Sequence, residues 1–341
     1  MREIAKALAA VASLLLSLTG APLAHAQSIE QFYQNKQIRF IVHSTPGGAY
    51  DGWTRLLGPY FSKYLPGNPV FVPQNMPGAG GLTATNYLFT RAPQDGSVIG
   101  MVGRNIPSDA VFAGAGATFD PRRFHWIGNP ERGATVAIVT GNAGVRSARD
   151  LFEREVLFGG AGAGSAVSQM PLVISRLLGM KFRLVEGYGS QSAITLALQR
   201  EEIHGTFATL TSVLSSFPGA VESGKLHVLF NLERKPVPEL KAPSIFEFAK
   251  TEEERQILAL LAVSSEVGRP ILAPPGTPPD RVAALRRAFE DSMKDPQLQA
   301  AAAKMGLPID VVSGTELQDI VNELMATPAP IVEKMRIMTR Q

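Results

Sequence analysis

The order of apolar and polar positions repeats one motif through the first third of the chain. A short apolar run rich in β-branched residues spans 38–42, breaks at Pro46-Gly47-Gly48, and gives way to apolar residues at helical spacing from about 51 to 64. This order predicts a strand, a tight loop and a helix. The same order returns from 70–75, and a third strand is predicted at 97–103. We expect a parallel sheet whose strand ends share one edge.

The pattern predicts a second unit of this kind in the middle of the chain. Strands are expected at 155–159, 181–186 and 205–209, with glycine or hydroxyl residues where each one ends. Apolar runs at 125–128 and 135–139 are typical of strands that cross between domains. Two α/β domains that direct their strand-to-helix turns at a common space, with crossing strands as the hinge, predict a clamp that closes on a ligand. The expected domains are a discontinuous first domain at 27–132 and 229–341 and a second domain at 133–228.

The first 26 residues are expected to lie outside this fold. Arg2 and Lys6 precede an apolar stretch that is too short to span a membrane, and a small-x-small tripeptide ends at Ala26. This arrangement predicts a secretory signal peptide that is cleaved after Ala26. We therefore expect the mature protein to be exported.

Composition excludes several classes of function. The sequence has no cysteine, which excludes disulfides, thiolate catalysis and cysteine-bound metals. The formal charge is only +3 over 341 residues, and no basic stripe occurs, so no nucleic-acid partner is expected. Neither histidine pairs nor acidic clusters occur at the spacing of metal ligands. We expect neither a metal nor a cofactor.

The loop 46–51 is the leading candidate for a binding site. It follows a strand at the edge where ligands bind in open α/β sheets, and the next helix offers unpaired N–H groups to an anion. Asp51 is interpreted either as a cap for this helix or as an acceptor for a ligand or water. Arg104, at the end of the third strand, is interpreted as a cation that pairs with a ligand carboxylate, with a solvated surface position as the alternative. Tyr50 and Trp53 are candidates for the cleft wall, with a core position as the alternative for Trp53.

Two glycine-rich segments come close to enzyme motifs without matching them. Residues 160–165 lie between a strand and a helix, as in a dinucleotide-binding turn, but Ser165 stands where the third glycine belongs. This segment is interpreted as an anion-binding helix start or as a plain turn. Residues 187–192 approach a nucleophile elbow but lack its final glycine. With no nucleophile beside a base, the protein is not expected to be an enzyme.

Four segments, in this order, resemble a known family. They are Pro46-Gly47-Gly48-Ala49-Tyr50-Asp51, Gln74-Asn75-Met76-Pro77-Gly78-Ala79-Gly80-Gly81, Ala92-Pro93-Gln94-Asp95-Gly96 and Ala273-Pro274-Pro275-Gly276-Thr277-Pro278. Together they resemble the extracytoplasmic substrate-binding receptors of tripartite tricarboxylate transporters, the Bug receptors, over essentially the whole mature chain. The resemblance implies a two-domain periplasmic-binding-protein fold (type II-like). It also implies a small mono- or dicarboxylate ligand and delivery to a membrane permease with one large and one small subunit.

The resemblance implies which residues bind the ligand. The two loops of the first domain are implied to hold a carboxylate through main-chain groups and bridging waters, opposite strand ends of the second domain. With Arg104, the expected ligand-binding residues are Gly47, Gly48, Ala49, Tyr50, Asp51, Pro77, Gly78, Ala79, Gly80, Gly81, Gly162, Ala163, Gly164, Ser165, Tyr188 and Thr209. We expect a monomer. The identity of the carboxylate stays open, and the alternatives are a sensor that signals to a membrane kinase and a periplasmic hydrolase on the same fold.

Overall fold

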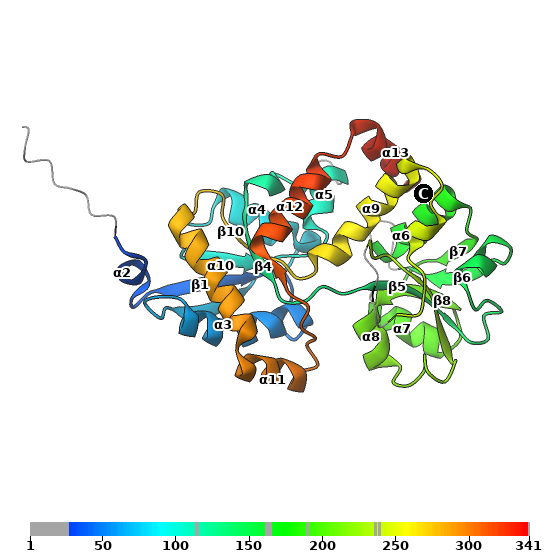
Figure 1. Ribbon diagram of the computed structural model, residues 1–341, viewed down its shortest axis with the longest axis horizontal. Coiled ribbons are helices and arrows are strands. Elements are labelled where there is room, and N and C mark those ends of the chain that lie inside the picture. Colours follow the sequence, from blue (N-terminus) through cyan, green and yellow to red (C-terminus); the bar gives the residue numbers. More distant parts are fainter. Residues whose placement is uncertain are drawn as a thin grey trace, which may run out of the picture.

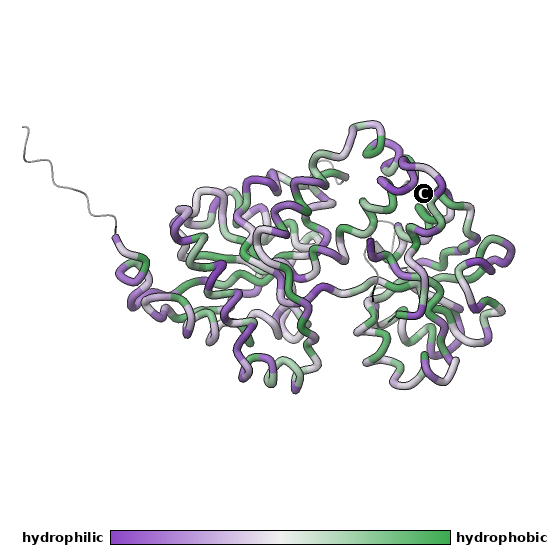
Figure 2. The backbone as a smooth tube through the Cα atoms, in the orientation of Figure 1, coloured by the Kyte–Doolittle hydropathy of each residue, from purple (hydrophilic) through white to green (hydrophobic). Residues whose placement is uncertain are grey.

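Two lobes, each built around its own β-sheet, make up the protein (Figure 1). The structure is a computed structural model that describes residues 27–112, 116–160, 166–188, 191–234, 237 and 240–339. The predicted two-domain α/β clamp is confirmed. Apolar segments gather inside each lobe, and polar segments lie mostly on outer helices and turns (Figure 2).

The sheet of lobe 1 carries the predicted parallel strands. Its members are β1 (Gln37–Val42), β2 (Val70–Asn75), β3 (Val98–Met101), β4 (His125–Asn129), β10 (Ile271–Ala273) and β11 (Val312–Ser313). They lie in the order β11-β4-β10-β3-β1-β2. β1 pairs in parallel with both β2 and β3, so the loops that follow these strands share one edge. β10 runs antiparallel between β3 and β4, which brings a late segment of the chain to the same place.

Helices cover both faces of this sheet. They are α2 (Ile29–Tyr33), α3 (Ala49–Tyr64), α4 (Leu82–Thr90), α5 (Ile106–Phe112), α10 (Pro279–Lys294), α11 (Pro296–Lys304) and α12 (Gly314–Met325), with short 3₁₀ turns η1 (Ala79–Gly81) and η3 (Pro121–Arg123). In α3, Trp53, Leu57 and Phe61 recur every four residues and are fully buried. This apolar stripe packs α3 against β2 and α10. Of the two positions considered for Trp53, the cleft wall and the core, the structure shows the core.

The sheet of lobe 2 has the order β7-β6-β8-β5-β9. Its strands are β5 (Thr135–Thr140), β6 (Val156–Gly159), β7 (Phe182–Val185), β8 (Gly205–Thr209) and β9 (Leu226–Asn231). The helical elements packed on it include α6 (Ala166–Leu178), α7 (Gln191–Gln199), α8 (Leu210–Ser216), η4 (Ala148–Phe152) and η5 (Ile245–Phe248). β6, β7 and β8 are parallel, as predicted, and β5 is antiparallel to both β8 and β9. The expected domain boundary between residues 228 and 229 falls inside β9.

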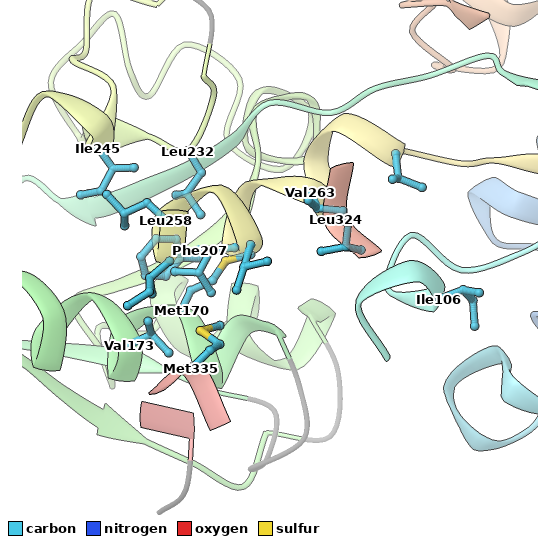
Figure 3. Close-up of a cluster of buried hydrophobic side chains, with 14 of the residues drawn as sticks. Ile106, Met170, Val173, Phe207, Leu232, Ile245, Leu258, Val263, Leu324 and Met335 are labelled. Atoms are coloured by element: carbon cyan, nitrogen blue, oxygen red, sulfur yellow. The ribbon is translucent and has the colours of Figure 1, made fainter. Parts of the chain in front are cut away.

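The chain crosses between the lobes at residues 130–134, from β4 to β5, and again after β9. α9 (Glu252–Val267) makes the second crossing, since it contacts η5 and α6 of lobe 2 as well as α5 and α12 of lobe 1 (Figure 1). α13 (Ala329–Thr339) packs against α6, α9 and α5. Figure 3 shows apolar side chains from these helices lying together, among them Met170, Leu258, Leu324 and Met335. One apolar cluster thus extends from lobe to lobe.

Candidate functional site

A cavity of about 280 Å³ lies where the two lobes meet. Lobe 1 contributes Arg104, just after β3, and Arg269, just before β10; Thr135 and Ser264 lie at the crossing. The lining residues from lobe 2 are Val167, Met170, Gln191, Phe207, Ala208, Thr209 and Ser212. A larger hollow of about 500 Å³ is confined to lobe 2, and one of about 330 Å³ lies between α9 and α12. The interlobe cavity is the candidate site because it lies at the ends of β3 and β8, where open α/β sheets bind ligands.

The backbone of Arg104 is held at the cavity by the first turn of α3. Its backbone N–H donates to the hydroxyl of Tyr50 at 3.2 Å. The ring of Tyr50 meets the imidazole of His43 edge-on, with the ring centroids 4.3 Å apart. Burial, with help from the charge of Arg269, lowers the pKa of His43 to about 4, so this imidazole is neutral at neutral pH. The backbone of Arg104 is therefore held by a tyrosine whose ring packs on a neutral imidazole.

Arg269 is the second cation of the cavity, and the sequence analysis did not identify it. Its side chain is only 13% exposed, and its guanidinium carbon lies 5.1 Å from the centroid of the Tyr50 ring. Nη2 lies 3.2 Å from Oε1 of Glu131. The donors at Nε and Nη1 are buried and have no hydrogen-bond partner in the part of the chain that the structure describes. A buried donor without a partner costs free energy, and a carboxylate oxygen is one acceptor that would offset this cost.

Glu131 supports Arg269 from behind. This residue is buried, and the Oε2 of its carboxylate accepts from the indole N–H of Trp53 at 2.6 Å. The side-chain oxygen of Asn129 accepts from the backbone N–H groups of both Glu131 and Arg269, each at 2.9 Å. Burial lowers the pKa of Arg269 and the charge of Glu131 opposes that shift, but a guanidinium remains protonated at any physiological pH. The pair thus fixes a charged group at the cavity edge.

Asp51 braces the first loop. Its Oδ2 accepts from the backbone N–H of Gly47 at 3.0 Å and from Nε of Arg55 at 2.9 Å, and its Oδ1 accepts from Asn75 at 3.0 Å. The hydrogen bond from Arg55 is the main reason why the pKa of Asp51 falls to about 2. Asp51 sits in the first turn of α3, where a negative charge is favourable, but its carboxylate ties Gly47 of the preceding loop and no side chain caps the helix at Gly48.

The second loop lies beside the first. Residues 78–81 all have positive φ, and a Cβ placed on Gly81 would lie 3.1 Å from Nδ1 of His43. The carbonyl of Gly80 accepts from the side chain of Asn105 at 3.2 Å, which joins this loop to the segment of Arg104. The ends of β1, β2 and β3 therefore meet, as the sequence predicts.

Lobe 2 presents a neutral surface to the cavity. Val167, Met170, Phe207 and Ala208 supply apolar atoms. Thr209 caps α8 by accepting from the backbone N–H of Ser212 at 3.3 Å. Nε2 of Gln191 is buried and lacks a partner among the residues with assigned positions. This side of the cavity can accept an apolar body and a few neutral hydrogen bonds.

The expected binding residues divide into several groups. Arg104 and Thr209 line the interlobe cavity, and Tyr50 contacts both of its arginines. Tyr188 instead packs against the apolar cluster formed by β5 and α7. The remaining positions of the first two loops lie at the same sheet edge but are not among the lining residues: Gly47, Gly48, Ala49, Asp51, Pro77, Gly78, Ala79, Gly80 and Gly81. The segment Gly162, Ala163, Gly164 and Ser165 lies outside the described residues.

Two other kinds of site, a membrane-spanning helix and a cluster of metal ligands, do not occur in the described part of the chain. None of its helices combines the length and apolar character that a membrane crossing requires. No three acidic or histidine side chains within it converge to form a metal site.

Comparison with solved structures gives the same architecture. The TctC solute binding protein from Polaromonas superposes with a TM-score of 0.68 at 17% identity, over 89% of this chain and 99% of that one. Rpa4515 of R. palustris with adipate gives 0.62 at 21%, over 89% and 97%. MatC from Rhodopseudomonas palustris with bound malate gives 0.58 at 16%, over 89% and 99%. At these identities the likeness establishes the fold.

The family follows from the sequence itself. The model of the tripartite tricarboxylate transporter family receptor, TctC, matches residues 55–337, which is most of the chain. The resemblance carried by the four motifs is therefore confirmed. The chain belongs to the tripartite tricarboxylate transporter receptor family, whose members are periplasmic solute-binding receptors.

Proposed function

We propose that this receptor captures a small carboxylate between its lobes and delivers it to a membrane permease with one large and one small subunit. The observation that carries the proposal is the pair of guanidinium groups, Arg104 and Arg269, at a cavity with no acidic side chain among its described lining residues. Arginine in such a position matches the charge and geometry of a carboxylate. The adipate and malate held by two proteins of the same fold are carboxylates as well.

We propose that the main-chain groups of the two loops complete the site. Residues 47–51 and 77–81 lie next to Arg104, and net hydrogen-bond contributions of about 0.5–1.5 kcal/mol each provide affinity without preventing release. Direct and water-mediated contacts are both suited to this role. The domain assignments, the monomeric state and the cleavage after Ala26 are parts of the same proposal, and the crossing at 130–134 serves as a hinge.

A thermal-shift screen tests this function. A carboxylate that binds should raise the unfolding midpoint of the chain from residue 27 onward, because a ligand at 100 times its Kd stabilises the folded state by about 2.7 kcal/mol. A shift of about 5 °C is then expected. The primary amides of the same acids are the control, since they keep the shape and lose the charge. The proposal is wrong if no carboxylate raises the midpoint, if the amides do so equally, or if the protein hydrolyses an ester.

A further inference from the structure

We propose that the ligand is a monocarboxylate with an apolar body, whose single charge is matched because Glu131 offsets one of the two arginines at the cavity. This inference rests on the function proposed above and specifies the class of ligand. It concerns which acid the receptor selects, and it assigns Arg269 as the residue that contacts the carboxylate.

The charges at the cavity lead to this conclusion. Among the lining residues with described positions, Arg104 and Arg269 are the ionisable ones. Glu131 lies behind Arg269 and contacts its Nη2 at 3.2 Å. The two arginines and the carboxylate that contacts Arg269 leave an excess of one positive charge. Glu233 also lies behind the lining, because it accepts from the backbone N–H of Thr135 at 3.0 Å, but burial raises its pKa to about 7, so it is partly neutral at neutral pH. One carboxylate would neutralise that excess.

The geometry of Arg269 places the carboxylate. Glu131 engages Nη2, and the donors at Nε and Nη1 are buried and unpartnered among the described residues, so a ligand would contact them once the guanidinium shifts toward the cavity. The contacts to Tyr50 and Glu131 hold the guanidinium in place before the ligand arrives, which reduces the entropy lost on binding. A carboxylate oxygen at Nε or Nη1 would form a charge-assisted hydrogen bond.

The opposite side of the cavity disfavours a second carboxylate. The described lining residues from lobe 2 are apolar or neutral, so a second charged group would lose water without gaining a cation. Phe207, Met170 and Val167 suit an alkyl chain or an aromatic ring. Gln191 and Thr209 can bind a hydroxyl or carbonyl group on that body. A dicarboxylate of the same length should therefore bind more weakly.

Calorimetric titration with matched pairs of acids tests the proposal. The pairs are butyrate and succinate, hexanoate and adipate, octanoate and suberate, and benzoate and terephthalate. In at least one pair, the monocarboxylate should bind about tenfold or more tightly than its dicarboxylate. If dicarboxylates bind equally or more tightly throughout, this inference is wrong while the carboxylate receptor function stands. If no acid of either class binds, both proposals fail.

Variants of the two charged residues test the role of Arg269. Arg269→Met should weaken binding of the preferred monocarboxylate about ten- to a hundredfold through loss of a charge-assisted contact. Glu131→Gln keeps an oxygen for Trp53 but raises the excess charge to two, so it should improve dicarboxylate binding relative to monocarboxylate binding about tenfold. Arg122→Met removes an exposed arginine of lobe 1 that is not among the lining residues of the cavity, and it should leave both affinities unchanged.

Arg104→Met provides a measurement that does not depend on whether the protein still folds when the Glu131–Arg269 ion pair is broken. It leaves Arg269 and Glu131 intact and removes the excess charge, so it should weaken monocarboxylate binding about tenfold or more. Unchanged affinity in both arginine variants, or an unchanged ratio of the two acid classes in Glu131→Gln, would overturn the proposal.

Discussion

Replacing Glu131 by alanine is expected to lower the free energy of unfolding by about 3–5 kcal/mol, because removing one partner of a buried ion pair leaves the other charge uncompensated. The side chains of Glu131 and Arg269 are 2% and 13% exposed. The substitution also removes the acceptor of the indole N–H of Trp53. Urea unfolding measured by fluorescence gives the difference directly.

The next residue along the chain provides the control. Arg132 forms a pair with Asp310, whose side chains are 33% and 50% exposed. Asp310→Ala breaks an ion pair at the same crossing segment but leaves both groups in contact with water, so a loss of about 1 kcal/mol or less is expected. Equal losses for the two substitutions would contradict the role that we assign to Glu131.

Gly268→Ala is expected to destabilise the protein and weaken ligand binding at the same time. Gly268 ends α9 with a φ of +62°, and a Cβ at this position would lie 2.3 Å from the carbonyl oxygen of Glu131 and 2.5 Å from the side-chain nitrogen of Asn129. Backbone strain of about 1–3 kcal/mol and a similar penalty for overpacking are expected together. Relief of the clash would displace Arg269, the next residue in the chain.

Gly306→Ala separates these two effects. Gly306 has a φ of +65°, but a Cβ there would meet no atom within 4 Å. It should show the backbone penalty without the clash, and carboxylate affinity should not change. If Gly306→Ala lowers stability and affinity as much as Gly268→Ala, close packing behind Arg269 is not the cause.

The parts of the fold that could be predicted from sequence carry local signals. Pro46-Gly47-Gly48 marks a turn between β1 and α3, and Asp51 reaches Gly47 only four residues away. Glycine and hydroxyl residues at the ends of its strands predict the second lobe in the same way. Such contacts are encoded within a few positions, so the parallel strands and the strand ends could be placed without coordinates.

α9 and Arg269 lack such signals. Residues 257, 258 and 260–265 of α9 are all buried, because the helix contacts both lobes, and this continuous burial removes the amphipathic period. Glu131, the partner of Arg269, is 138 positions away in sequence and contacts Trp53 across another 78. An arginine between a glycine and a proline gives no local indication of either contact. The second cation of the site therefore emerges only from the tertiary structure.

Ligand-driven closure of the lobes is the most direct test of the central claim that the carboxylate binds between them. The chain has no cysteine, so Leu214→Cys at α8 and Met305→Cys after α11 would label exposed sites on opposite lobes (Figure 1). Energy transfer between dyes at these positions should rise when a stabilising carboxylate is titrated, with the same midpoint as its binding. Unchanged transfer at saturating carboxylate would contradict the account, because the ligand would then contact a single lobe.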